Sequence, residues 1–228
     1  MPSHRLSVVV WLGVFLALLA FQTLSPDSAG AYTYSNDFEG STPWPEWNYP
    51  NAKATTPVGG RNFLGIFSNH TATLILTSFG AGASVTVEFD LFILRSWDGN
   101  NTYWGPDYWS LFAGSQTLMN TTFSNDFGGG QSYPGDYYTN NSPRTGAVEN
   151  NTLGYGSGGW GDSVYHITKS YTHAGGPVVI NFQGYNLQGW NDEGWGLDNV
   201  RVNVIPLPGT ILLLGSGLLG LVGLSRKR

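Results

Sequence analysis

One segment decides the fold: residues 84–95, which read SVTVEFDLFILR. Apolar side chains at every second position are typical of a β-strand that buries one face, because successive side chains of a strand point to opposite sides. The segment therefore predicts a strand with one face entirely in a hydrophobic core. The predicted core face carries Val85, Val87, Phe89, Leu91 and Ile93, and the other face carries Thr86, Glu88, Asp90, Phe92 and Leu94.

Further segments of the same character follow along the chain, each bounded by Gly, Asn, Asp or Pro. No helical period separates them. About nine or ten short strands without helices indicate an all-β fold, a two-sheet antiparallel sandwich with jelly-roll-like connectivity. Alternation in the last strand breaks at Asp198-Asn199, which predicts a β-bulge there. The other predicted strands are residues 34–39, 62–67, 72–78, 108–113, 117–123, 163–170, 177–185 and 195–204.

Composition agrees with one β-rich domain between two apolar ends, over residues 32–204. The chain has 228 residues, 32 of them Gly, with 14% aromatic and 11% charged residues. Short strands and turns suit this mixture better than helices do. Cysteine is absent, which excludes disulfides and thiolate metal sites. The long Gly-, Asn- and Tyr-rich stretch 124–160 predicts a functional loop.

The charge balance excludes one class of partner. Residues 32–205 carry fourteen of the fifteen acidic side chains but only six of the ten basic ones, and those six are scattered. Nucleic-acid binding needs clustered cations to neutralise phosphates, so no nucleic-acid partner is expected. Neutral sugars, cations or other proteins fit an acidic surface better.

The N-terminal residues 1–31 predict a secretory signal peptide. His4 and Arg5 form a short basic start, residues 8–21 form an apolar run, and Ala29 and Ala31 form a small-x-small cleavage site. A membrane anchor would need a longer apolar core. We therefore expect the chain to be exported by the secretion machinery and cut before Tyr32.

The C-terminal residues 205–228 contain a second hydrophobic segment. Twenty residues, 205–224, are free of charge, which is long enough for a transmembrane helix. The basic cluster Arg226, Lys227 and Arg228 follows and favours the cytoplasmic side, so the domain would face outward.

The same segment begins with a Pro-x-Pro frame, Pro206 and Pro208, followed by Gly209 and a glycine-bearing apolar run. This order of proline motif, hydrophobic helix and basic end resembles the PEP-CTERM sorting signal of Gram-negative bacteria. Leu207 stands where that motif usually has an acidic residue. The resemblance implies processing by an exosortase, transient anchoring in the inner membrane, and release to the cell surface or an extracellular polysaccharide matrix. A C-terminal anchor that is never cut is the alternative.

The two ends of the domain carry short acidic motifs. Residues 36–40 read NDFEG, and residues 191–202 read NDEGWGLDNVRV. An early Asp-Phe-Glu paired with a late Asp-Asn-Val strand resembles the concanavalin-like and MAM-like jelly-roll domains of extracellular adhesion and carbohydrate-binding proteins. The resemblance implies neighbouring first and last strands, which would bring Glu39 close to Asp198.

A calcium site is the first site hypothesis. Ca²⁺ takes six to eight oxygen ligands from carboxylates, amides and carbonyls, and the loops and strand ends offer such groups. Solvated turn residues are the alternative, because Asp and Asn also favour turns for their own backbone hydrogen bonds. The predicted ligands are Asp37, Glu39, Asp90, Asp98, Asp107 and Asp198.

Carbohydrate binding is the second hypothesis. Sugar rings stack on aromatic faces, and polar side chains near them bind hydroxyl groups. Large aromatics are often core anchors instead, so exposure decides which of them can bind. The predicted sugar-binding residues are Trp97, Tyr103, Trp104, Trp109 and Trp190.

Catalysis has little support from the sequence. Glu88 and Asp90 share a strand face, as the two carboxylates of a glycoside hydrolase could. The chain has no Gly-x-Ser-x-Gly nucleophile motif and no zinc-binding His pair. We therefore expect a non-enzymatic surface or matrix protein, adhesive or associated with exopolysaccharide. A lectin-like module and a polysaccharide-active hydrolase are the alternatives.

Overall fold

Two β-sheets make up the computed structural model of the protein, which describes residues 30–126, 128–156 and 160–207. Residues 31–206 form one compact unit. One sheet contains β1 (Tyr32–Asn36), β2 (Lys53–Thr55), β3 (Asn62–Phe67), β5 (Ser84–Arg95), β8 (Glu149–Asn150), β9 (Gly161–Thr172) and β11 (Glu193–Ile205). The other contains β4 (Thr71–Phe79), β6 (Tyr108–Ala113), β7 (Gln116–Thr122) and β10 (Gly176–Tyr185).

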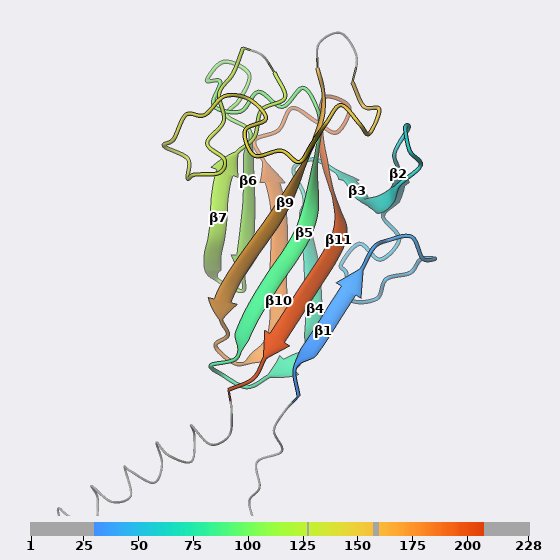
Figure 1. Ribbon diagram of the computed structural model, residues 1–228, viewed down its shortest axis with the longest axis vertical. Helices are drawn as coiled ribbons and strands as arrows, with labels where there is room; N and C mark the ends of the chain where they lie inside the picture. The colour runs from blue at the N-terminus through green and yellow to red at the C-terminus, as the bar shows by residue number, and fades with distance from the viewer. Residues whose placement is uncertain (1–29, 127, 157–159, 208–228) are drawn as a thin grey trace, which may run out of the picture. The chain divides into compact units, whose positions relative to one another are not determined.

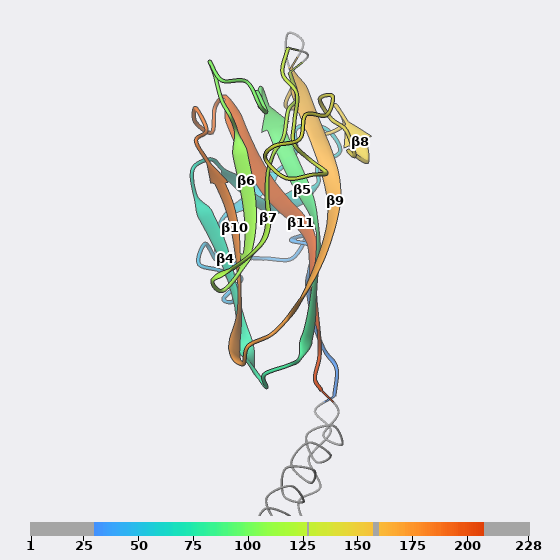
Figure 2. The same cartoon turned by 90° about the vertical axis from the view of Figure 1, so that its left-hand side faces the viewer.

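All strand pairs are antiparallel. The larger sheet has the order β2-β3-β11-β5-β9-β8, with β1 also paired to β11, and the smaller sheet has the order β4-β10-β6-β7. Figure 2 shows the two sheets as facing layers. The prediction of an all-β fold with two antiparallel sheets is confirmed.

β5 lies at the centre of the larger sheet, between β11 and β9, and its bounds are those predicted. Its predicted core face is completely buried between the sheets, in contact with residues such as Trp109 and Phe182 of the smaller sheet. Burial of these large side chains is the main stabilising contribution to the fold. The alternating apolar side chains that predicted the strand are thus the side chains that pack the two sheets together.

The last strand, β11, contains the predicted irregularity. Its register with β5 shifts between Asp198 and Arg201, and Asn199 has a φ angle of +50°. The same edge of β11 pairs with β3 before the shift and with β1 after it. The bulge predicted at Asp198-Asn199 is confirmed.

The outer face of the larger sheet, which points away from the smaller sheet, has a polar part and an apolar part. Its polar part includes Glu88, Asp90 and His166. Near the end of β5, a second apolar cluster covers this face instead, formed by Phe63, Phe92, Leu94, Leu153 and Val164. The loop that carries Leu153 thereby buries the two apolar residues predicted on the non-core face of β5.

Several connections meet at one end of the sandwich, which we call the loop end (Figure 1). They are residues 96–107 between β5 and β6, the long connection from 123 toward β9, and residues 186–192 between β10 and β11. The long connection includes the short strand β8, which the sequence did not predict, and β2 was not predicted either. Both are short and mostly accessible, so they lack an alternating apolar pattern.

The predicted terminal signals fall mostly outside the described residues. These include the signal peptide up to Ala29, and Pro208, Gly209, Arg226, Lys227 and Arg228 of the PEP-CTERM-like segment, whose identity stays a prediction. Within residues 30–126, 128–156 and 160–207, no helix is long and apolar enough to cross a membrane. The predicted localisation, which depended on anchoring by a C-terminal helix, is corrected to this extent: the part of the chain that the structure describes provides no such anchor.

Candidate functional site

Strand pairing brings three acidic residues together at the loop end. β5 and β11 are antiparallel, so Arg95 at the end of β5 lies opposite Glu193 at the start of β11. Asp98 follows β5 closely, and Asp107 directly precedes β6. The Trp97 indole donates a hydrogen bond of 2.8 Å to the carbonyl oxygen of Gly194, which fixes this segment against β11.

Asp98, Asp107 and Glu193 form a carboxylate triad, with one oxygen of each within 4.8 Å of the others. Asp107 and Glu193 are completely buried, and Asp98 is 8% exposed. The backbone amide of Asp98 donates to Asp107, and the backbone amide of Gln188 donates to Glu193. The remaining oxygens, Asp107 Oδ1 and Glu193 Oε1, are buried and accept no hydrogen bond.

The surroundings of the triad disfavour three negative charges. Burial raises the pKa of Glu193 and of Asp107 well above the ordinary carboxyl range, and their mutual repulsion adds to the increase for Glu193. Burial also raises the pKa of Asp98, and the nearby charge of Asp126 contributes. No ion pair between described residues involves the triad. The carboxylates therefore need either protons or a cation.

A hard divalent cation fits the residues present. The donor set consists of carboxylate oxygens, which Ca²⁺ and Mg²⁺ prefer, and contains no imidazole or thiolate that would favour a softer metal. Two of the oxygens are buried without a partner, which costs about 1–3 kcal/mol for each such group. The triad could therefore hold a metal ion.

Beside the triad lies a hollow of about 400 Å³, which we call the acidic hollow. Asp98 belongs to both the triad and the hollow. Trp104 and Trp160 line it with 57% and 50% of their surfaces exposed. Carboxylates and accessible indoles are thus combined in one concave site, whose lining is Ser96, Asp98, Trp104, Asp126, Trp160, Gln188 and Asp192.

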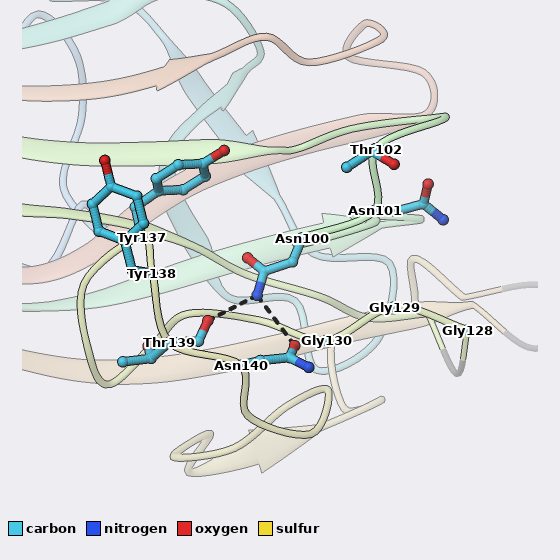
Figure 3. A pocket seen from close by; sticks show the side chains of 10 residues that line it. All are labelled: Asn100, Asn101, Thr102, Gly128, Gly129, Gly130, Tyr137, Tyr138, Thr139 and Asn140. Carbon is cyan, nitrogen blue, oxygen red and sulfur yellow. Dashed lines mark hydrogen bonds between the residues drawn. The ribbon is translucent and has the colours of Figure 1, made fainter.

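A second hollow of about 640 Å³ lies at the same end, and its lining contains no charged side chain (Figure 3). We call it the amide hollow. Asn100 Nδ2 donates to the carbonyl oxygen of Thr139 at 2.9 Å and to Asn140 Oδ1 at 3.2 Å, which joins the two walls. Its lining is Asn100, Asn101, Thr102, Gly128, Gly129, Gly130, Tyr137, Tyr138, Thr139 and Asn140.

Two of the predicted calcium ligands, Asp37 and Glu39, lie outside any such acidic group among the described residues. Asp37 Oδ1 accepts from the backbone amide of Glu39 at 3.2 Å, as in a turn. The carboxylate of Glu39 accepts from the backbone and side-chain amides of Asn62, and these bonds lower its pKa. Their oxygens serve local hydrogen bonds, and the metal-ligand role of this pair stays a prediction.

Asp90 and Asp198 are partners across β5 and β11, on the polar outer face of the larger sheet. Asp90 Oδ1 lies 2.8 Å from His166 Nδ1. Arg61 pairs with Asp198 at 3.3 Å and with Glu149 at 2.9 Å. A guanidinium therefore supplies a positive charge beside Asp198, and the metal-ligand role of these two residues stays a prediction. Of the six predicted ligands, Asp98 and Asp107 belong to the acidic group of three that the described residues form.

The predicted sugar-binding aromatics divide by burial. Trp97 and Trp109 are completely buried in the core, so they offer no face to a sugar and the prediction is wrong for them. Tyr103, Trp104 and Trp190 are exposed. Tyr103 packs edge-on against Trp104, with ring centroids 4.6 Å apart. Of these three, Trp104 lines the acidic hollow, and a sugar-binding role for the exposed residues stays a prediction.

Glu193 and Trp160 are among the site residues that the sequence did not predict. Glu193 begins β11, and knowledge that β11 pairs antiparallel with β5 would have placed it beside the residues that follow Arg95. Trp160 lies at the end of the long Gly-rich stretch, where no local pattern distinguishes an exposed indole from a core anchor. An isolated Trp in a loop predicted to be functional is the signal that could have identified it.

No family model matches the chain, and no curated protein matches it. Among solved structures, the chain is similar to the C-terminal CBM6 of LamC, a marine laminarinase from Zobellia galactanivorans, with 12% identity, a TM-score of 0.37, and coverage of 75% of this chain and 98% of that chain.

It is also similar to dimeric latent PorU from Porphyromonas gingivalis, with 12% identity, a TM-score of 0.41, and coverage of 76% of this chain but only 12% of that chain. Both TM-scores are below 0.5, so neither similarity carries an argument about function. The functional interpretation depends on the residues of the loop end.

Proposed function

We propose that this protein is a non-enzymatic carbohydrate-binding protein that holds a polysaccharide at its loop end. One observation carries the proposal: Trp104 and Trp160 are both half-exposed and line one hollow together with carboxylate and amide side chains. Indole faces stack on sugar rings, and the polar groups can accept or donate hydrogen bonds to hydroxyl groups.

The amide hollow supports a binding surface longer than one sugar. Residues 98–101 contact residues 128–130, and the backbone amide of Asn100 donates to the carbonyl oxygen of Gly130 at 2.7 Å. Gly99, with a φ angle of +65°, allows this close approach, because a side chain there would clash with Gly130. The two hollows are therefore built from adjoining segments, as a site for an extended saccharide would require.

The strand connections support a jelly-roll-like arrangement, which we include in the proposal. Several successive strands change layer: β3 to β6 lie in turn in the larger, smaller, larger and smaller sheet, and β9 to β11 lie in the larger, smaller and larger sheet. This connectivity gathers the connections of both sheets at the two ends of the sandwich. A binding site made of several loops follows naturally from it.

The test is calorimetric titration of the full chain with four neutral hexasaccharides of different linkage: maltohexaose, cellohexaose, laminarihexaose and N-acetylchitohexaose. At least one should bind, and Trp104→Ala should weaken that binding about tenfold or more, because it removes the stacking surface. Trp190→Ala is the matched control, since it removes an indole of 55% exposure that lines neither hollow. Absence of binding to all four sugars, or equal effects of both substitutions, would refute the proposal.

We further propose that the cation held by the triad is Ca²⁺. The support is the pair of buried, unpartnered oxygens on Asp107 and Glu193, within reach of the Asp98 carboxylate. Ca²⁺ would supply the positive charge that the triad lacks, and carbonyl oxygens and water would complete its shell. Chelation should lower the melting temperature, since a ligand bound only by the folded state raises stability. An unchanged melting temperature would count against the site.

The non-enzymatic part of the proposal has its own support and test. Glu88 and Asp90, the two carboxylates that a hydrolase could use, both lie within 3.1 Å of the same exposed side chain, His166. Such a shared ion pair satisfies both groups without a substrate. Incubation of the full chain with each hexasaccharide should release no reducing sugar. Release that Glu88→Gln abolishes would replace this proposal with a glycoside hydrolase.

A further inference from the structure

The carboxylate triad and the acidic hollow share both a residue and their supporting contacts. We infer that a divalent cation at the triad controls the affinity of the acidic hollow for saccharide. This inference rests on the proposed function, because it concerns the regulation of that same site. It requires that filling the triad changes the position or order of the hollow's walls.

Asp98 provides the direct link. Its carboxylate is one of the three triad groups, and its side chain also lines the acidic hollow. Trp104 belongs to the same connection, between Asp98 and Asp107, so both triad members at the ends of this segment position the indole between them. A cation that holds Asp98 and Asp107 together therefore fixes the base of the segment that carries Trp104.

Gln188 provides a second link, from the opposite wall. Its backbone amide donates to the carboxylate of Glu193, and its side-chain Nε2 donates to the carbonyl oxygen of Trp104 at 2.9 Å. Gln188 itself lines the acidic hollow. Gln188 thereby connects Glu193 directly to the segment that carries Trp104, the predicted stacking side chain.

A third link runs through the residue before Glu193. The backbone amide of Ser96 donates to the carbonyl oxygen of Asp192 at 3.0 Å, and the Ser96 hydroxyl donates to the Asp192 carboxylate. Ser96 and Asp192 both line the acidic hollow. Segments 96–107 and 186–193 are thus joined on both sides of the triad, and each contributes walls to the hollow.

Without a cation, the contacts inside the triad are unfavourable. Asp107 Oδ1 and Glu193 Oε1 have no hydrogen-bond partner, and three carboxylates face one another in a buried site. Repulsion between these groups favours states in which segments 96–107 and 186–193 separate. A cation reverses this preference, so it binds the ordered hollow better than the disordered one. Thermodynamic linkage then requires that saccharide and cation strengthen each other's binding equally.

The experiment uses the full chain after removal of divalent ions, and titrates it with Ca²⁺ alone and then with the four hexasaccharides in the presence and absence of Ca²⁺. We expect Ca²⁺ to strengthen binding of the bound hexasaccharide by roughly 5- to 150-fold, the usual range of coupling between two sites. Hydrogen exchange should show that Ca²⁺ alone protects segments 96–107 and 186–193.

Two variants test whether the triad is responsible. Glu193→Gln and, in case it fails to fold, Asp107→Asn should each abolish the Ca²⁺ dependence of sugar binding and of hydrogen exchange. Glu88→Gln makes the same chemical change on the polar sheet face and should keep both. The inference is overturned if Ca²⁺ binds but sugar affinity changes less than about twofold, or if the triad variants retain the coupling. Absence of sugar binding at every Ca²⁺ concentration instead refutes the proposed function itself.

Discussion

Substitution of Glu193 by Gln should raise the stability of the metal-free protein and reduce the stability that the protein gains from Ca²⁺. The change removes one buried charge but keeps the shape of the side chain. The amide nitrogen also brings a hydrogen-bond donor into the triad, where Asp107 Oδ1 accepts no hydrogen bond. Relief of one unsatisfied buried group is worth about 1–3 kcal/mol. In chelator at pH 8, the variant should therefore melt roughly 2–12 °C above the unmodified protein.

The pH dependence follows from the direction of the pKa shifts. Burial raises the pKa of Asp107 and Glu193 in the folded state above their ordinary values of about 4. The folded state then binds more protons than the unfolded state, so the free energy of unfolding falls as pH rises from about 4 to the raised pKa values. In chelator, the unmodified protein should lose stability from pH 5 to pH 8, and the variant should lose less.

Calcium should offset the advantage of the variant, because it stabilises the unmodified protein more. At a Ca²⁺ concentration one hundred times its dissociation constant, binding adds about 2.7 kcal/mol of stability. For a domain of this size that raises the melting temperature by roughly 5–11 °C. Glu193→Gln should lose most of this increase, whereas Glu88→Gln should keep it. Differential scanning calorimetry measures each case. A variant that is destabilised in chelator at pH 8, yet stabilised by Ca²⁺ as strongly as the unmodified protein, would show that Glu193 is not a metal ligand.

Three further predictions concern the fold and the polar sheet face. Leu91→Ala should lower the free energy of unfolding, measured in urea, by about 2–5 kcal/mol, because Leu91 is completely buried between the sheets. Ile75→Ala, at a half-exposed site, should lower it by less than about 1 kcal/mol. Equal losses would argue against the sandwich core. The pKa of His166 measured by NMR titration should lie above 6.5, chiefly because of its hydrogen bond to Asp90, and Asp90→Asn should lower it; an unchanged value would exclude that contact. Burial raises the pKa of Asp198 to about 6, so its contribution to stability falls as pH rises from about 4 to 6. Asp198→Asn should therefore flatten this part of the curve of stability against pH. A variant curve parallel to that of the unmodified protein would contradict this prediction.

Sequence predicts best those strands whose apolar side chains alternate because one face is buried. β5 was located to the residue because its apolar side chains alternate without interruption, and the bulge in β11 was located because alternation fails there. β2 and β8 were missed because strands of two or three residues at the margin of a sheet bury too little to leave a pattern.

The candidate site was predictable only in part, because it depends on pairing between distant segments. Asp98 and Asp107 lie near each other in sequence and were both included, whereas Glu193 reaches them through the pairing of β11 with β5. In the same way, Arg61 is distant in sequence from Asp198 and supplies a counter-charge that the sequence did not indicate. Trp104 and Trp109 illustrate the same limit, since similar local sequences leave one indole exposed and the other completely buried.

The pairing of β1 with β11 has a mechanical consequence. Tyr32 lies opposite Val204, so the chain enters and leaves the sandwich at neighbouring points, at the end opposite the loop end (Figure 1). β11 has 13 residues and so separates the two ends by roughly 40 Å. Tension between residues 31 and 206 would peel β1 from β11 one hydrogen-bonded pair after another. Tension between a saccharide at the loop end and either terminus would instead load β5 and β11 along their length, where many hydrogen bonds must break together. The sandwich is therefore weakest across its own termini and strongest along the direction in which a bound polymer would pull.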